Sequence, residues 1–423
     1  MSGIERQRRI YLAGVGGRTP RVPVDVTKLE RRAKQAMSRE AYAYVAASAG
    51  AGRTLAANLA DFDRHRIVPR VLRDVSRRDT SVELFGRRLD SPIMLAPIGV
   101  LELAHRDADL AVARAAAAEN VPMVISNQAS TPIEEIVDAL GDSPRWFQLY
   151  WSTSDDLVES LVGRAEACGA DAIAVTLDTT MLGRRTRDLD IAYLPFLRGK
   201  GIAQYTSDPV FRRLLDEAPG GGSDAATREQ PRPTPKALGT LIQILRNWPG
   251  GAVEGLRSGH ARAAVERFIQ IYSRPSLTWE DLPFLRERTK LPILLKGILH
   301  PDDARRAIDE GIDGIVVSNH GGRQVDGAVS TIEALPAVAE AVGGRAPILL
   351  DSGIRGGADA FKAIALGASA VLIGRPYVYG LAAGGEAGVR EVIQNMTGEF
   401  DLTMGLAGCA STAEIGEQCL TSA

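Results

Sequence analysis

A histidine, two glycines and an arginine follow one apolar segment of the sequence in close succession. The segment GIVV (314–317) continues into SNHGGRQVD (318–326). Histidine is the only side chain whose ordinary pKa lies near neutrality, so His320 is a candidate base. The glycines allow the backbone to approach a bound molecule, and Arg323 offers a fork of donors that fits a carboxylate or a phosphate. The alternative interpretation is a buried structural histidine beside an ordinary tight turn.

Polar side chains also end the other apolar segments of the chain. In chain order, the residues at these ends are Gly99, Ser126, Asn127, Gln148, Tyr150, Thr176, Asp178, Lys296, His320, Arg323, Asp351, Ser352, Gly353, Ile354, Arg355, Gly374 and Arg375. A dry core would not hold this set, because each polar group without a hydrogen bond costs several kcal/mol. The turns DSGIRGG (351–357) and IGRP (373–376) combine glycines with an arginine, which favours a phosphate site over plain turns.

The apolar segments alternate with amphipathic or alanine-rich stretches, and this alternation predicts a barrel. The eight predicted strands cover 92–99, 122–127, 145–151, 172–178, 292–298, 314–321, 347–353 and 370–376. Their continuous apolar character is typical of parallel strands buried on both faces. The predicted fold class is therefore α/β, a (β/α)8 TIM barrel. A doubly wound sheet is the alternative, but no GxGxxG follows the first strand. In the third strand, Trp146 is predicted to point outward.

Two regions lie outside the predicted barrel units. Residues 1–91 form a helical N-terminal segment that packs on the barrel, with one helix over 26–47, and the barrel itself takes 92–423. A long insert over 186–275 interrupts the barrel after strand four.

The insert itself is predicted to be partly helical. Its helices are expected over 208–218 and 236–248, joined by a mobile loop rich in glycine and proline at 218–235. A connection of this length is uncommon unless it has a function. It is predicted to be a lid, with subunit contacts as the alternative role.

Composition excludes several classes of function. The chain has 423 residues, of which 45% are hydrophobic and 24% charged, and its net charge of −2 gives no reason to expect nucleic acid or a membrane as partner. We see neither a secretory signal nor an apolar segment long enough to span a bilayer. Cys168, Cys409 and Cys419 show no metal-binding spacing, which favours a cytoplasmic location and no metal site.

The motifs resemble those of one known family. APIG, FQLYW, TLDTTMLGRRTRD, LLKGI, SNHGGRQVDG and DSGIRGGADAFKAIALGASAVLIGRP are similar to segments of the FMN-dependent L-2-hydroxyacid oxidases and dehydrogenases, the glycolate oxidase-like family. The resemblance runs from about residue 42 to 408. APIG, DLDIAYLPFLRG and the long insert look most like the L-lactate 2-monooxygenase branch.

The resemblance implies roles for individual residues. The backbone of Pro97, Ile98 and Gly99 would follow the flavin ring, and Ser126, Gln148, Thr176, Ser318 and Lys296 would hydrogen-bond it. The phosphate would be held by Asp351, Ser352, Gly353, Ile354, Arg355, Gly374 and Arg375. The substrate would be surrounded by Tyr44, Tyr150, Arg185, His320 and Arg323. His320 would be the catalytic base, Asp178 its carboxylate partner, and Lys296 the catalytic cation near the ring.

The resemblance also implies a reaction. The expected substrate is a lactate-like L-2-hydroxy acid, with O2 as acceptor and oxidative decarboxylation of the retained keto acid to acetate, CO2 and water. The alternatives are a simple oxidase that releases keto acid and H2O2, a dehydrogenase that uses a quinone or protein acceptor, and a flavin-binding scaffold without activity. Gln128 stands where glycolate oxidase has a tryptophan, so the side-chain pocket differs from the glycolate one. A homo-tetramer or octamer is expected.

His65, His105, His260 and His300 are predicted to be structural or exposed, and Asp188 is predicted to pair with Arg185 or Arg187.

Overall fold

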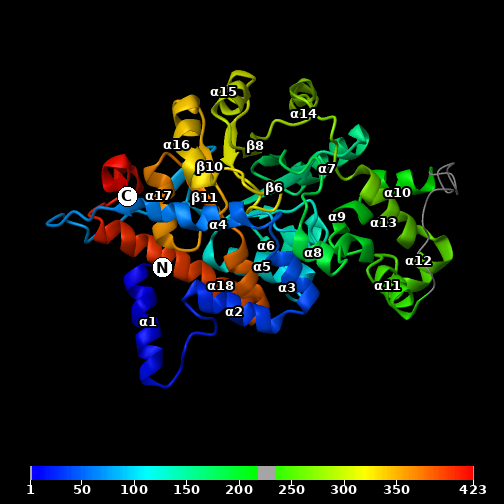
Figure 1. Cartoon of the computed structure of the whole chain (residues 1–423), viewed down its shortest axis with the longest axis horizontal. Coiled ribbons are helices and arrows are strands. Elements are labelled where there is room, and N and C mark those ends of the chain that lie inside the picture. Colours follow the sequence, from blue (N-terminus) through cyan, green and yellow to red (C-terminus); the bar gives the residue numbers. More distant parts are fainter. Residues whose placement is uncertain (1, 218–233, 423) are drawn as a thin grey trace.

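Eight parallel strands form a closed barrel in the computed structural model of the chain, which describes residues 2–217 and 234–422 (Figure 1). The strands are β4 (Ile93–Leu95), β5 (Met123–Ile125), β6 (Arg145–Tyr150), β7 (Ile173–Thr176), β8 (Ile293–Ile298), β9 (Gly314–Val317), β10 (Ile348–Leu350) and β11 (Ala370–Ile373). Each pairs with the next, and β11 returns to β4. All eight lie within the predicted segments, so the (β/α)8 prediction is confirmed and the doubly wound alternative is wrong.

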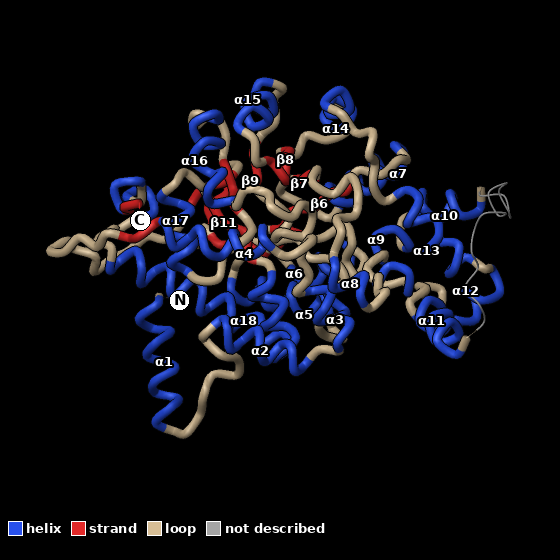
Figure 2. Tube along the Cα trace, in the orientation of Figure 1, coloured by secondary structure: helices blue, strands red, loops and turns tan. Residues whose placement is uncertain are grey.

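Helices surround the barrel (Figure 2). β2 (Val82–Leu84) and β3 (Arg87–Leu89) form an antiparallel hairpin that packs on the side chains inside the barrel. The helices that follow individual barrel strands are α5 (Ala108–Glu119), α6 (Ile133–Leu140), α7 (Asp155–Ala167), α15 (Pro301–Asp309), α16 (Thr331–Val342), α17 (Gly357–Ala365) and, after the last strand, α18 (Arg375–Leu406). The described chain also contains short 3-10 turns, which are η1 (Asp61–Arg64), η2 (Leu101–Leu103), η3 (Pro195–Arg198), η5 (Trp279–Asp281), η6 (Thr412–Glu414) and η7 (Glu417–Cys419).

Trp146 corrects one prediction. Its side chain is buried inside the barrel with Met94 and Val124, and its ring centroid lies 5.7 Å from that of Phe85 in the hairpin turn. Side chains alternate along a strand, so Trp146 must lie on the same face as Gln148, which reaches the cavity described below. The expectation that Trp146 points outward was wrong because it ignored this alternation.

The N-terminal segment contains two helices where one was predicted over 26–47. They are α2 (Val26–Ala36) and α3 (Arg39–Val45), preceded by α1 (Gly3–Val15) and followed by α4 (Arg53–Ala60). The break occurs because the Ser38 hydroxyl accepts the backbone N–H of Ala41 at 3.1 Å and caps a new helix. Beyond α4, β1 (His65–Ile67) pairs antiparallel with β12 (Leu420–Ser422), which joins the N-terminal segment to the last strand of the described chain.

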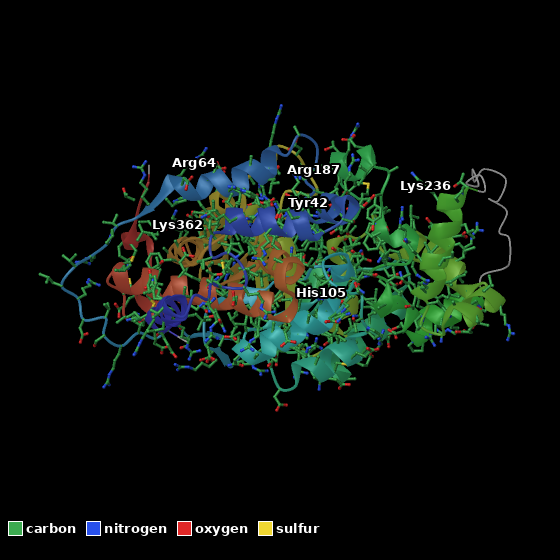
Figure 3. All side chains as sticks on the ribbon, turned by 90° about the horizontal axis from the view of Figure 1, so that it is seen from below. Tyr42, Arg64, His105, Arg187, Lys236 and Lys362 are labelled. Atoms are coloured by element: carbon green, nitrogen blue, oxygen red, sulfur yellow. The ribbon has the colours of Figure 1, made fainter. Side chains whose placement is uncertain are left out.

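The insert between β7 and β8 forms a helical lobe at one end of the molecule (Figure 1). Its helices are α8 (Thr186–Asp190), α9 (Ala203–Thr206), α10 (Pro209–Asp216), α11 (Pro235–Arg246), α12 (Ala252–Ser258) and α13 (His260–Ile271), and α14 (Leu282–Arg286) follows before β8. Helices α10 and α11 correspond to the two predicted ones. Of the predicted mobile loop at 218–235, residues 218–233 lie outside the described residues, and the last two, Thr234 and Pro235, cap and begin α11. Figure 3 shows Lys236, on α11, at the end of the molecule opposite Arg64 and Lys362.

An aromatic cluster joins the lobe to the barrel. The ring of Phe268 on α13 lies 4.8 Å from Tyr205, 5.2 Å from Phe196 and 5.1 Å from Tyr272, measured between centroids. Phe196 in turn meets Tyr44 of the N-terminal segment edge-on at 6.4 Å. The Tyr205 hydroxyl also donates to Oδ1 of Asn127, just after β5, at 3.4 Å, so the lobe is packed against the end of the barrel where the strands end. Over the described residues, every helix is too short or too polar to cross a membrane.

Candidate active site

A cavity of about 1150 Å³, counted with its open mouth, lies at the carboxyl ends of the barrel strands. The predicted site residues that line it are Tyr44, Pro97, Ile98, Gly99, Gln148, Tyr150, Thr176, Arg185, Lys296, His320, Arg323, Asp351, Ser352, Gly353, Ile354, Arg355, Gly374 and Arg375. The carboxyl ends of the strands are where barrels carry their active sites. The other three predicted residues, Ser126, Asp178 and Ser318, lie directly behind this lining, where each contacts a lining residue.

His320 is held by a buried carboxylate. Its Nδ1 lies 2.9 Å from Oδ1 of Asp178. Burial raises the energy of the Asp178 carboxylate, but the charges of His320 and Lys296 outweigh this effect and lower its pKa. An ionised carboxylate only accepts, so Nδ1 of His320 donates and Nε2 keeps its lone pair. Burial is also the largest cause of a lowered pKa at His320, which Asp178 only partly opposes. The imidazole is therefore neutral near pH 7 and able to accept a proton.

The turn that carries His320 is left-handed over three residues. The φ angles are 57° at His320, 67° at Gly321 and 73° at Gly322. Gly321 lines the cavity, as expected for a glycine that admits a ligand. Gly322 does not line the cavity. It faces α4 instead, where a Cβ on residue 322 would lie 2.7 Å from the backbone nitrogen of Leu55. The second glycine thus allows the N-terminal segment, rather than a ligand, to approach.

Two arginines without a carboxylate ion pair flank the ring of Tyr44 in the described structure. The guanidinium carbons of Arg185 and Arg323 lie 5.9 and 5.0 Å from the ring centroid. Burial, together with the charges of Arg185 and Arg375, lowers the pKa of Arg323 to about 9. The Nε of Arg185 is buried and has no hydrogen-bond partner among the described residues. This excess of positive charge and free donors suits a small carboxylate.

Asp188 does not form the ion pair predicted for it within the described residues. Arg187 donates to the carbonyl of Ala46 at 3.2 Å instead. Asp188 is buried, and burial raises its pKa against the opposing charges of Arg323 and Arg185. Its carboxyl group therefore interacts with the charges of Arg323 and Arg185 without a direct ion pair to either in the described structure.

Residues 44–53 of the N-terminal segment hold both arginine-bearing loops together. Arg323 Nη1 donates to the carbonyl of Tyr44 at 2.7 Å. The backbone N–H of Ala49 donates to Gly322 at 2.8 Å, and that of Gly50 donates to Arg184 at 2.9 Å. The two loops and the segment therefore form one hydrogen-bonded unit over the cavity.

Asp326, the last residue of the SNHGGRQVD motif, adds to the same unit. Its carboxylate accepts the backbone N–H groups of Ala51 at 2.7 Å and Arg53 at 2.6 Å, at the start of α4. The motif therefore supplies a structural anchor in addition to its candidate base and arginine.

Lys296 provides a fixed cation at the floor of the cavity. Its Nζ donates to Ser318 Oγ at 2.7 Å and lies 2.8 Å from Oδ2 of Asp351. Burial alone would lower the pKa of Lys296, but the carboxylates of Asp351 and Asp178 outweigh it and raise the pKa. The ammonium is therefore permanently charged at neutral pH.

Amide and hydroxyl groups line the side of the cavity formed by β5 to β7. Gln148 Nε2 donates to Thr176 Oγ1 at 3.1 Å, and its Oε1 accepts from Ser126 Oγ at 3.1 Å. Burial raises the pKa of Tyr150 to about 12, so its hydroxyl stays protonated and can donate. These fixed dipoles suit a ligand with several polar ring atoms.

The turns after β10 and β11 fit an anion. Arg355 and Arg375 form no ion pair with any carboxylate that the structure describes, and burial lowers the pKa of both, that of Arg375 to about 10. Ser352 and Gly353 have φ angles of 73° and 99°, which turn the backbone around the site. A Cβ at Gly353 would lie 2.1 Å from the carbonyl oxygen of Asn58, so only glycine fits there. Two buried cations beside a glycine turn form a suitable phosphate site.

Several lining residues were not predicted from the sequence. Phe196 and Tyr272 come from the insert, and Thr179 and Leu182 also reach the cavity, whereas Gln128, which was expected to shape the side-chain pocket, lines it as well. No local pattern marks the first two, because only the packing of α13 and η3 brings them here. Of the remaining histidines, His65, His105, His260 and His300, none lines the cavity within the part of the chain described.

Comparison with known proteins gives one consistent result. The model of the family described as FMN-dependent dehydrogenase matches residues 33–422. The chain is 40% identical over 415 residues to the FMN-dependent alpha-hydroxy acid dehydrogenase qulF of Penicillium citrinum, covering 98% of this chain and 94% of the relative. It is 39% identical over 389 residues to the L-lactate oxidase of Lysinibacillus sphaericus, covering 92% of this chain and 90% of the relative. A crystal structure of mandelate oxidase with (S)-4-hydroxymandelic acid superimposes with a TM-score of 0.77 at 36% identity, covering 95% of this chain and 99% of that one.

Proposed function

The chain belongs to the FMN-dependent dehydrogenase family and oxidises a 2-hydroxy acid with FMN as its cofactor, and from this premise we propose that the substrate is a lactate-like L-2-hydroxy acid and the acceptor O2. The observation that carries the proposal is the meeting of the His320–Asp178 pair with two unpaired arginines in one cavity. A relative named L-lactate oxidase supports the choice of substrate size.

We propose the following residues for FMN. The flavin ring would lie against the backbone of Pro97, Ile98 and Gly99, with Ser126, Gln148, Thr176, Ser318 and Lys296 as its polar neighbours. The phosphate would be held by Asp351, Ser352, Gly353, Ile354, Arg355, Gly374 and Arg375. When bound, FMN would supply the acceptor for the two electrons that leave the substrate. The buried positive charge of Lys296 would stabilise negative charge on the ring beside it.

The side chains of the cavity would bind and deprotonate the substrate. Arg185 and Arg323, with Tyr44 and Tyr150, hold the carboxylate and hydroxyl, which fixes the α-carbon in place. His320 Nε2 then accepts a proton from the substrate hydroxyl or α-carbon. Asp178 stabilises the imidazolium that results, because its carboxylate lies 2.9 Å from Nδ1.

The insert bears on the fate of the product. Phe196 and Tyr272 place the insert in the cavity wall. A wall that retains the keto acid until O2 has reacted would allow decarboxylation, whereas early release would give free H2O2. We propose that the enzyme retains the keto acid and acts as a monooxygenase that forms the decarboxylated acid, CO2 and water.

Aerobic turnover of L-lactate is expected to yield mainly acetate with little H2O2. In Tyr272→Ala, which opens the wall, the products should shift toward pyruvate and H2O2. Leu238→Ala on α11, an exposed residue of the same insert, should leave the ratio unchanged. Pyruvate and H2O2 in equal amounts from the unaltered protein would show a simple oxidase. An absence of O2 consumption with intact flavin reduction would show a dehydrogenase with another acceptor.

The pH dependence should reflect the lowered pKa of His320. The reactive form is the neutral imidazole, so kcat/KM is expected to stay level near neutrality and to fall tenfold per pH unit only below the ordinary histidine value of about 6.5. Asp178 raises the pKa of His320, so Asp178→Asn should move this fall to still lower pH while reducing the rate. A fall that begins above pH 6.5 in the unaltered protein would contradict the assignment.

The homo-tetramer or octamer and the cytoplasmic location stay predictions.

A further inference from the structure

The side-chain amide of Gln324 bridges two loops of the candidate active site. Gln324 lies in the loop after β9, and its Nε2 donates to the carbonyls of Asp178 at 2.7 Å and Met181 at 2.9 Å in the loop after β7. Its Oε1 accepts from the backbone N–H of Gly183 at 3.4 Å and from Nη2 of Arg185 at 3.3 Å. The orientation of the amide is fixed, because the reverse orientation would set its oxygen against two carbonyls and its NH2 group against two donors.

The two loops also contact each other through their backbones. A Cβ on Gly183 would lie 2.4 Å from the carbonyl oxygen of Arg323 and 2.7 Å from Cα of Gln324, so only glycine allows this approach. Gln324 itself does not line the cavity. It therefore acts on a bound substrate only through the residues that it holds in place.

Arg185 is the cavity residue whose side chain depends most directly on this bridge. The residue is 5% exposed, and its Nε is buried without a hydrogen-bond partner. Within the described structure, the oxygen of Gln324 is the acceptor that its guanidinium group finds. Because the amide is neutral, it orients the guanidinium group and leaves its charge available to a bound carboxylate.

Repulsion between the two arginines explains why Arg185 needs a restraint. The charge of Arg185 contributes to the lowered pKa of Arg323, so the two guanidinium groups repel each other before a carboxylate binds. Arg323 is held by the carbonyls of Tyr44 at 2.7 Å and Ala47 at 3.3 Å. The amide of Gln324 has the corresponding role for Arg185. An arginine that is already in place loses less freedom on binding, which strengthens binding of the substrate carboxylate.

We propose that Gln324 is a positioning residue that holds Arg185 beside Arg323 in the orientation that binds the carboxylate of the 2-hydroxy acid. The two hydrogen bonds that the amide donates fix it to the loop after β7, and its oxygen then orients the guanidinium group. This inference rests on the proposed function and deepens it, because it explains how the substrate-binding pair is kept in place.

The test begins with two variants of Gln324 in the FMN-loaded protein. Gln324→Met keeps the length of the side chain and should raise KM for L-lactate by roughly 2- to 12-fold, the usual effect of one lost hydrogen bond, with a smaller change in kcat. Gln324→Glu should raise KM further, because its carboxylate would pair with Arg185 and compete with that of the substrate. We expect the same order for the Kd of pyruvate, the keto acid formed from lactate, measured by flavin absorbance without turnover.

A double-mutant cycle with Arg185→Met separates positioning from a general loosening of the loop. In the Arg185→Met background, Gln324→Met should change KM and the Kd of pyruvate by less than about twofold, because the group that Gln324 orients is absent. Thr186→Val is the matched control. Thr186 anchors the same loop to the carbonyl of Gly50 at 3.0 Å through its hydroxyl and does not contact the guanidinium group. Its KM should stay within about twofold of the original value.

The outcomes separate the role of Gln324 from the proposed function. Losses that multiply in the cycle, or an equal rise of KM in Gln324→Met and Thr186→Val, would overturn the role of Gln324. Loss of FMN in Gln324→Met would also overturn it, because the residue would then support the cofactor. If Gln324→Met does not fold, Gln324→Glu replaces it in the cycle with the same expected coupling to Arg185. Failure of every 2-hydroxy acid to reduce the flavin of the unaltered protein would instead refute the proposed function.

Discussion

His320→Gln is expected to slow the reduction of bound FMN by substrate by at least about 10²–10⁴-fold, the usual contribution of a general base. Glutamine keeps a polar group of similar size beside Asp178 but cannot accept the proton. Removing the imidazole also leaves the Asp178 carboxylate buried without its partner, and its Oδ2 already has no hydrogen bond in the described structure. The measurement is anaerobic stopped-flow mixing with L-lactate, followed by the flavin absorbance.

The slower flavin reduction in His320→Gln must come from the missing base and not from a misfolded protein. The variant should therefore contain FMN in the same amount as the unaltered protein. His300→Gln is the matched control, because His300 is exposed and lies outside the cavity. Rapid bleaching in His320→Gln would place the base elsewhere.

Arg323→Met is expected to raise KM for the 2-hydroxy acid by roughly 10- to 150-fold and to slow reduction as well. A charge-assisted hydrogen bond contributes about 1.5–3 kcal/mol, which gives the range for KM. The slower reduction follows because a carboxylate held by Arg185 alone leaves the α-carbon displaced from His320. Steady-state kinetics and anaerobic reduction at several substrate concentrations measure the two effects.

Arg323 also donates to the carbonyls of Tyr44 and Ala47, so part of the effect could come from a loosened N-terminal segment. Arg187→Met tests this contribution. Arg187 holds the same segment through Ala46 at 3.2 Å but does not line the cavity. Its replacement should leave KM within a few-fold of the original value. The KM of Arg323→Lys should fall between that of the unaltered protein and that of Arg323→Met, because lysine keeps the charge but loses the forked pair of donors. An unchanged KM in Arg323→Met would exclude a role in binding the carboxylate.

The features that the sequence predicted well are those that leave a local pattern. Each barrel strand is a continuous apolar run, and the polar residues that follow such runs meet at one end of a parallel barrel, so His320 and Lys296 could be placed near each other without coordinates. The break at Ser38 also carries a local signal, a serine followed by helix-forming residues, and the prediction of one helix over 26–47 missed it.

The features that were missed depend on contacts between distant parts of the chain. Tyr272 reaches the cavity only because α13 packs on Phe196 through Phe268. Gly322 was expected to admit a ligand, whereas its real neighbour is Leu55. No spacing rule joins Phe268 to Phe196 or Gly322 to Leu55, so these pairings become visible only in the folded chain.

The anchoring of residues 44–53 has a consequence for biosynthesis. The ribosome makes this segment early, yet Ala51 finds its partner Asp326 only 275 residues later. Until then Tyr44 and its neighbours have no loops to hold, and Arg185 has no opposite arginine. The substrate site is thus among the last parts of the protein to assemble, after β9 has left the ribosome. A nascent chain cannot oxidise metabolites before the barrel around its flavin is nearly complete.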